Sequence, residues 1–367
     1  MPATSVTAPT PLPDAPRILL VRTSAMGDVV HALPVAAALA RHRPGATIGW
    51  VVEEAYAPLL TGHPAVDEVL PVRLKRWRRR PFAASTLGEL AALRRAFARF
   101  RPDVAIDLMG NHKGALLARL SGAPRVVGAA RADRREPSSA LWIGESADPA
   151  ATAGSLPVHA VERALALAGT LGASTLPVDL GGAGLFPDLP RVPPANLVLH
   201  AGAGWGNKRW PAERWGEVAR RLALDTGLPV RAPIGPGEEA LVAAVVAASG
   251  GVVEPVPAAD LPTLASELLG ARLVLAGDTG PLHLAHALAV PVLAVMGPTD
   301  PRRHGPYGAP ARAVWETLPC SFCYKRFTET KACLHAVSVR RVVERALALL
   351  ASEGGTATYC GPSGPTA

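Results

Sequence analysis

Residues 17–31, RILLVRTSAMGDVVH, place a carboxylate where an apolar strand gives way to a helix. The apolar run ends near Thr23, Gly27 permits a tight turn, and Asp28 falls at or just before the first helical turn. An aspartate in this position caps free backbone N–H groups and is favoured by the helix dipole. A second hypothesis is that Asp28 is a general base, which requires a substrate hydroxyl beside it.

A glycine-rich turn with a lysine follows an apolar run in the second half of the chain, in VLHAGAGWGNKRWP (198–211). Such turns bring backbone N–H groups close to a diphosphate, and Lys208 offers a compact positive charge. The segment lacks Gly-Lys-Ser/Thr, so it is not a Walker A motif. It therefore indicates a phosphate site only in combination with other segments.

A second turn of this kind occurs in LVLAGDTGPLHLAHALAVPVLAVMGPTDP (273–301), which reads as strand, turn, helix and strand. Asp278, Thr279 and Gly280 form the turn. Backbone amides at the start of the helix would face a phosphate, the Thr279 hydroxyl could donate to it, and His283 could reach it from the first turn. The alternative for His283 is a core histidine whose hydrogen bonds are satisfied.

The densest charge in the chain, RLKRWRRRP (73–81), surrounds Trp77 with basic residues. They are Lys75, Arg76, Arg78, Arg79 and Arg80. One interpretation is a solvated, charged loop. The other is a surface that meets an anionic membrane or the carboxylate and phosphate groups of a ligand.

Two series of alternating strands and helices must position these residues. Apolar runs typical of buried parallel strands alternate with alanine- and arginine-rich helical stretches, first over 17–130 and again over 196–297. The pattern predicts an α/β protein with two doubly wound lobes whose ligands lie at the carboxyl ends of the strands. The expected segments are a flexible N-terminal arm (1–16), a first Rossmann-like domain (17–175), a Pro/Gly-rich linker (176–195), a second Rossmann-like domain (196–337), a C-terminal helix (338–352) and a flexible tail (353–367).

Composition restricts the class of protein. The 367 residues suffice for two domains. No uncharged apolar run reaches the roughly 18 residues that span a bilayer. Residues 1–16 lack a basic start followed by an apolar stretch, so we expect no signal peptide and a cytoplasmic protein with reduced cysteines. The net charge of +8 indicates attraction to polyanions such as nucleic acid, anionic lipid or a phosphorylated substrate.

Seven segments are distinctive in combination and in order: SAMGDVVHALP, WVVEEAY, KRWRRRPF, RREP, HAVER, KRWP and DTGPLHLAHALAVPVLAVMGPTDP. Together, from about residue 17 to 302, they resemble the lipopolysaccharide heptosyltransferases of glycosyltransferase family 9, and most of all its heptosyltransferase I branch. The resemblance implies a GT-B fold, in which two doubly wound Rossmann-like lobes face a central cleft. It also implies that heptose is transferred, with inversion at the anomeric carbon, from ADP-L-glycero-D-manno-heptose to Kdo2-lipid A.

The resemblance implies a role for individual residues. Asp28 matches the catalytic base. The residues that match donor binding are Lys208, Glu238, Asp278, Thr279, Gly280 and His283, with Glu239 as an alternative register for Glu238. The residues that match acceptor binding are Lys75, Arg76, Arg78, Arg79, Lys113 and Arg135, with Arg134 as an alternative to Arg135. Neither a metal nor another cofactor is implied.

The resemblance also implies partners and a location. It predicts a cytoplasmic monomer, peripherally associated with the cytosolic face of the inner membrane, that binds ADP-heptose and Kdo2-lipid A or a related inner-core lipid, and no nucleic acid. Because the base lies in the first lobe and the donor site in the second, both lobes would have to close to unite them.

Two segments depart from the heptosyltransferase I pattern. Gly202, Ala203 and Gly204 stand where relatives usually carry hydroxyl residues, so backbone N–H groups would have to replace some hydrogen bonds to the diphosphate. The cysteine cluster in residues 318–335 is more similar to heptosyltransferase II.

The cysteine spacing also raises the question of a metal. Cys320, Cys323 and Cys333, with His335 nearby, could in principle bind zinc, but the spacing does not match the usual paired knuckles, so we expect reduced thiols. Three alternative functions remain open: transfer onto an existing heptose, sugar-nucleotide epimerisation, and nucleic-acid binding. The aromatic content of 5% is low for a protein that stacks bases.

Overall fold

The computed structural model describes residues 11–147, 158–173, 180, 182–324 and 332–352. These residues divide into two compact units. The first unit comprises the chain up to Ser24 together with His31–Gly184, and the second comprises Ala25–Val30 together with the chain from Leu185 onward. The predicted arm, linker and tail lie partly or wholly outside the described residues, as does Cys360.

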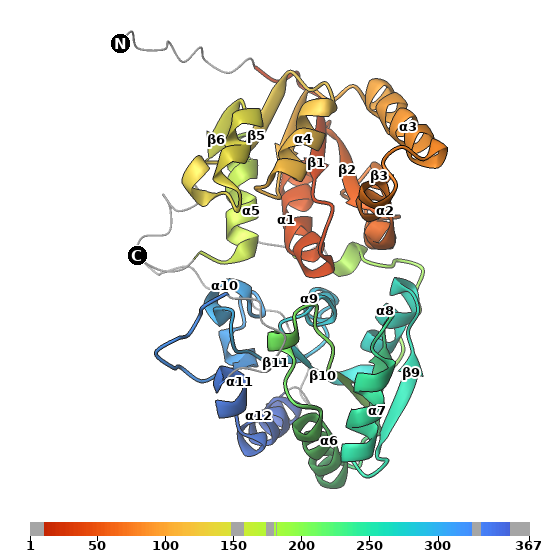
Figure 1. The fold of residues 1–367 in the computed structure, drawn as a ribbon, viewed down its shortest axis with the longest axis vertical. Helices are drawn as coiled ribbons and strands as arrows, with labels where there is room; N and C mark the ends of the chain where they lie inside the picture. The colour runs from red at the N-terminus through yellow and green to blue at the C-terminus, as the bar shows by residue number, and fades with distance from the viewer. Residues whose placement is uncertain (1–10, 148–157, 174–179, 181, 325–331, 353–367) are drawn as a thin grey trace. The chain divides into compact units, whose positions relative to one another are not determined.

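The first unit is built on a six-stranded sheet in the order β3-β2-β1-β4-β5-β6, with all neighbouring strands parallel (Figure 1). Its strands are β1 (Arg17–Val21), β2 (Thr47–Glu53), β3 (Glu68–Val72), β4 (Val104–Asp107), β5 (Arg125–Ala129) and β6 (Glu145–Ala147). Its helices are α1 (Met26–His42), η1 (Glu54–Leu59), α2 (Leu74–Arg79), α3 (Ala84–Phe100), α4 (His112–Leu120), η2 (Arg131–Asp133), η3 (Pro137–Trp142), α5 (Ala160–Gly169) and η4 (Gly182–Gly184). The start of α1, up to Val30, groups with the second unit, and the rest of α1 with the first. The strand order reverses between β1 and β4, which is where open α/β sheets bind ligands.

The second unit repeats this plan with the order β12-β11-β10-β7-β8-β9 (Figure 1). Its strands are β7 (Asn196–His200), β8 (Val230–Ile234), β9 (Val253–Pro257), β10 (Ala271–Gly277), β11 (Val292–Val295) and β12 (Ala313–Val314). Its helices are η5 (Gly206–Lys208), α6 (Ala212–Thr226), α7 (Glu239–Ala248), α8 (Leu261–Leu269), α9 (Gly280–Ala287), α10 (Pro301–His304), η6 (Pro310–Arg312), α11 (Ala332–Ala336) and α12 (Val339–Ser352). Because β7 pairs with β10, the loops after these two strands emerge side by side.

The buried residues explain why these segments form strands and helices. In the first unit, α3 and α4 bury Leu93, Phe97 and Leu117 in one cluster with Leu19 and Val51 of the central strands. Both helices therefore cover the same face of the sheet. The predicted α/β class with two doubly wound units is confirmed.

Tryptophans anchor the core of the second unit. Trp210 and Trp215 are fully buried and pack edge to face, with ring centroids 4.9 Å apart. The indole Nε1 of Trp210 donates to the carbonyl of Leu334 at 3.0 Å, which ties α11 to the start of α6.

The expectation of a loop at the basic cluster is wrong. Residues 74–79 form the helix α2, and Trp77 is buried in the core of the first unit rather than offered to a membrane. Its indole Nε1 donates to Glu89 Oε2 at 2.6 Å, so a carboxylate from α3 satisfies the one polar atom of the ring.

No helix in the described ranges is long and apolar enough to cross a membrane.

Stability of the second unit should depend on pH through His286 of α9. Its Nε2 donates to the Tyr307 carbonyl at 2.8 Å, and burial lowers the pKa of His286 to about 4. Between pH 4 and 6.5 the unfolded chain binds a proton that the folded imidazole does not, so the free energy of unfolding rises with pH across this window. Urea midpoints at pH 5 and pH 7 should differ less in His286→Gln than in the wild type. The exposed His42→Gln is the control, and an unchanged pH slope in His286→Gln would contradict the assignment.

Candidate active site

Asp28 is the third residue of α1 and closes the first turn of that helix. Its Oδ2 accepts a hydrogen bond from the backbone N–H of Ala25 at 3.1 Å. A carboxylate that reaches back to the N-cap amide is one half of a capping box. The carboxylate is also partly exposed, so the structural role and a catalytic role are compatible.

Asp278 lies at the end of β10 and is the centre of a polar cluster in the second unit. Its Oδ2 accepts from Lys208 Nζ at 2.6 Å and from Thr299 Oγ1 at 2.6 Å, and its Oδ1 is 3.3 Å from His283 Nε2. The structure thus brings three predicted donor residues together. Thr299 was missed by the sequence analysis, although it stands in the turn GPTDP that follows β11.

The charges of this cluster support one another. Burial alone would raise the pKa of Asp278, but the ammonium of Lys208 and the hydrogen bond from His283 hold it well below its usual range. Burial lowers the pKa of the neighbouring His304 to about 4, so this imidazole is neutral near pH 7. An ionised Asp278 would repel a diphosphate, so we assign it the positioning of Lys208, whose ammonium also lies 4.5 Å from the centre of the Trp205 ring.

The start of α9 offers donors to an anion. Thr279 is the N-cap residue and Gly280 is the first residue of the helix. The Thr279 hydroxyl is buried and makes no hydrogen bond to any described residue. Buried polar groups are normally bonded, so this open hydroxyl beside free helix amides is suited to a phosphate oxygen.

Glu238 lies next to this region, and its contacts favour Glu238 over Glu239 as the predicted donor residue. Its Oε2 accepts from the Gly235 backbone N–H at 3.2 Å, and its Oε1 is 3.8 Å from His200 Nε2. Glu239 is exposed. A Cβ at Gly202 would overlap the Glu238 carboxylate, which is a physical reason for glycine in place of a hydroxyl residue there.

Replacing Lys208 by alanine should weaken ADP binding about tenfold to a hundredfold, because charge-assisted hydrogen bonds contribute about 1.5–3 kcal/mol. His283→Ala should weaken it less, because His283 Nε2 already faces Asp278 Oδ1 at 3.3 Å. Isothermal titration calorimetry with ADP measures both. The exposed Lys113→Ala, in the first unit, is the matched control. An unchanged ADP dissociation constant in Lys208→Ala would remove this cluster from the donor site.

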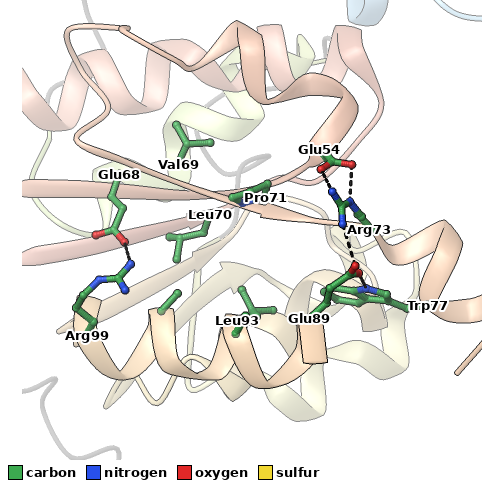
Figure 2. A pocket seen from close by; sticks show the side chains of 12 residues that line it. Glu54, Glu68, Val69, Leu70, Pro71, Arg73, Trp77, Glu89, Leu93 and Arg99 are labelled. Carbon is green, nitrogen blue, oxygen red and sulfur yellow. Dashed lines mark hydrogen bonds and ion pairs between the residues drawn. The ribbon is translucent and has the colours of Figure 1, made fainter. Parts of the chain in front are cut away.

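A pocket of about 290 Å³ in the first unit lies beside the basic cluster, and Glu54, Arg73, Trp77 and Glu89 are among the residues that line it (Figure 2). The predicted acceptor residues are not among the described residues that line this pocket. Arg73 forms a bidentate ion pair with Glu54 and donates to Glu89 Oε1 at 2.8 Å. Arg76 forms an ion pair with the same Glu89. Arg76 is therefore partly neutralised. Lys75, Arg78 and Arg79 are exposed, and none of them forms an ion pair within the described part of the chain.

The two arginines of RREP have different environments. Arg134 is fully buried, pairs with Asp107 and donates from Nε to Ser139 Oγ at 2.7 Å. Arg135 is exposed, like Lys113 on α4. The guanidinium of Arg134 is thus occupied within the fold, which favours Arg135 as the acceptor residue.

The three cysteines in the described part of the chain are free thiols. Cys320 is exposed, Cys323 is half-buried and Cys333 is buried, where burial raises the pKa of its thiol. Among the residues that the structure describes, no group of three or more His, Cys, Asp or Glu side chains is arranged to hold a metal ion.

Two α/β units, each built on a parallel sheet, with a candidate anion site at the strand-order reversal of the second, are typical of a glycosyltransferase of the GT-B type. The chain belongs to glycosyltransferase family 9 (heptosyltransferase), whose model matches residues 90–334. The predicted family, GT-B fold and enzyme class are confirmed. Membership favours glycosyl transfer over the epimerase hypothesis.

Proteins similar in sequence or structure to this chain are named as heptosyltransferases. The chain is 37% identical over 314 residues to lipopolysaccharide heptosyltransferase 1 of Pseudomonas aeruginosa, covering 84% of this chain and 86% of that one. It is 35% identical over 310 residues to lipopolysaccharide heptosyltransferase 1 of Escherichia coli K12, covering 80% and 91%. The solved structure of E. coli heptosyltransferase WaaC with ADP superposes with a TM-score of 0.76 at 30% identity, covering 91% and 99%.

Proposed function

We propose that this protein transfers a heptose from ADP-heptose to the inner core of lipopolysaccharide, with the Kdo region of Kdo2-lipid A as acceptor and with inversion at the anomeric carbon. One observation carries the donor half of this proposal: Lys208, held by buried Asp278, lies in the same cluster as the start of α9 with its open Thr279 hydroxyl. The names of the relatives, and the ADP in the WaaC structure, support the identity of the donor.

In this mechanism the second unit stabilises the departing ADP. The N-terminal amides of α9, the Thr279 hydroxyl and the Lys208 ammonium would receive the negative charge that develops on the diphosphate as the glycosidic bond breaks. The Glu238 carboxylate would accept hydrogen bonds from the ribose hydroxyls.

Asp28 would act on the other substrate. As the acceptor hydroxyl attacks the anomeric carbon, the Asp28 carboxylate removes its proton, so one displacement forms the new bond and releases ADP. The exposed cations Lys75, Arg78 and Arg79, with Lys113 and Arg135, would bind carboxylates of Kdo and phosphates of lipid A.

The alternative acceptor is an inner core that already carries one heptose, as in the heptosyltransferase II branch, and the cysteine cluster is its one support. Incubation with ADP-heptose and either purified Kdo2-lipid A or its heptosylated form separates the two. We expect mass spectrometry to find one added heptose on Kdo2-lipid A only. Addition to the heptosylated form alone would overturn the acceptor assignment, and ADP release without any acceptor would overturn the transfer.

A lipid acceptor also implies where the enzyme works. We infer that it binds peripherally at the cytosolic face of the inner membrane, because the sugar donor is water-soluble and the acceptor is anchored in the bilayer.

A further inference from the structure

Among the described residues of the first unit, the large apolar side chains that are exposed lie in one part of it. They are Phe82, Leu87, Leu90, Leu116, Leu120, Leu141 and Trp142. All seven lie in α3, the connection before it, α4 or η3. In the described part of the second unit, exposed large apolar residues such as Leu224 in α6 and Val252 just before β9 occur singly in the sequence. A cluster of apolar side chains on a solvent-exposed face marks an interaction surface.

These elements share one face of the sheet. The buried sides of α3 and α4 pack in a common core cluster. On the outer side of α4, Leu116 and Leu120 are one turn apart and point the same way. The 3₁₀ helix η3 packs against α4, and Trp142 Nε1 donates to His112 Nδ1 at 3.3 Å, which places the Trp142 ring beside that helix.

The same stretch holds the positive charge of the chain. Residues 74–142 contain fifteen lysines and arginines against five aspartates and glutamates, whereas the whole chain has a net charge of +8. The acidic side chains are engaged: Asp107 pairs with buried Arg134, Asp133 with Arg163, and Glu89 with Arg76. Exposed basic side chains on these elements include Arg79, Arg80, Arg94, Arg95, Lys113, Arg119 and Arg135.

We propose that this face, formed by α3, α4, η3 and the segment before α3, docks on a bilayer that contains anionic lipid. Five leucines, one phenylalanine and one tryptophan among arginines suit the boundary between headgroups and acyl chains. There, apolar side chains enter the membrane, tryptophan stays at the interface and basic residues meet anionic headgroups. A nucleic-acid surface would instead interleave several aromatic rings with the cations. The inference rests on the proposed function, because docking of this face would bring the acceptor residues to a lipid surface. Its test, however, needs neither the donor nor the acceptor.

Vesicle flotation tests the proposal with the full chain and no donor or acceptor. Wild type should float with vesicles of phosphatidylethanolamine and phosphatidylglycerol, remain unbound with pure phosphatidylcholine, and be released by high salt. Leu120→Ser/Leu141→Ser should reduce the partition coefficient roughly tenfold, because two aliphatic anchors are removed while all charges stay. Leu224→Ser in α6 is the matched control, with a side chain that is also strongly exposed, and should partition like wild type.

Three results would overturn the proposal: equal partition of the double variant and wild type, equal binding to phosphatidylcholine, or a concentration-dependent dimer that the double substitution abolishes, which would assign the face to a second copy of the chain. Turnover with a deacylated acceptor distinguishes this failure from failure of the proposed function. This turnover should be the same in the double variant and in the wild type. If the wild type does not turn over the deacylated acceptor, the result counts against the proposed heptosyl transfer and not against the docking surface.

Discussion

Replacing Asp28 by asparagine should lower kcat about 10²–10⁴-fold, the range that a general base commonly contributes, and leave ADP affinity and the urea midpoint unchanged. The asparagine Oδ1 can still accept the Ala25 N–H bond that the structure shows at 3.1 Å. The helix cap therefore survives, and only the ability to take a proton is lost. Steady-state rates of ADP release at saturating donor and acceptor measure the effect.

Two controls separate the roles of Asp28. Asp28→Ala removes both the base and the cap, so it should lose activity and also about 1 kcal/mol of stability. Asp260→Asn alters another carboxylate that caps a helix, since Asp260 Oδ1 accepts from the Thr263 N–H at 2.8 Å, and it should leave turnover intact. Near-normal turnover of Asp28→Asn with saturating acceptor would reduce Asp28 to a cap.

Replacing Arg134 by methionine should cost about 3–5 kcal/mol in the free energy of unfolding, because it leaves the buried Asp107 carboxylate without its counter-charge. Both side chains of this pair are fully buried. Arg134 also donates from Nη1 to the Ala129 carbonyl at 3.3 Å and so holds the segment that follows β5. Denaturant unfolding of the first unit measures the loss.

The neighbouring position provides the control for this substitution. Arg135→Met changes an exposed side chain, so it should leave stability nearly intact and raise the KM for the lipid acceptor. Asp107→Asn/Arg134→Met removes both charges and should recover part of the stability lost in the single variant. Equal stability of Arg134→Met and Arg135→Met would contradict the structural role of Arg134.

The strand and helix alternation could be predicted because buried parallel strands appear as continuous apolar runs. The strand β9, VEPVP, was not identified, since it contains two prolines and a glutamate. It lies at the edge of its sheet, where proline is tolerated because one side of the strand needs no ladder hydrogen bonds. Such a strand is defined by its neighbour β8 and not by its own composition.

Contacts between distant residues explain what the sequence could not reveal about the sites. Trp77 looks like a surface residue among arginines, and its burial depends on Glu89, twelve residues away. Thr299 joins Asp278 only because β10 and β11 are neighbours in the sheet. Arg134 and Arg135 are adjacent residues of the same type, so the sequence does not distinguish them. The path of the loop that carries them directs the Arg134 side chain into the protein.

The configuration of the new glycosidic bond tests the proposed single displacement most directly. If the acceptor oxygen, deprotonated by Asp28, attacks the anomeric carbon as ADP leaves, then the product must have the configuration opposite to that of the donor. Nuclear magnetic resonance of the heptosylated acceptor, read from the one-bond C1–H1 coupling of the transferred heptose, determines it. We predict inversion in every product molecule; a product that retains the donor's configuration would contradict Asp28 as the base of a direct attack.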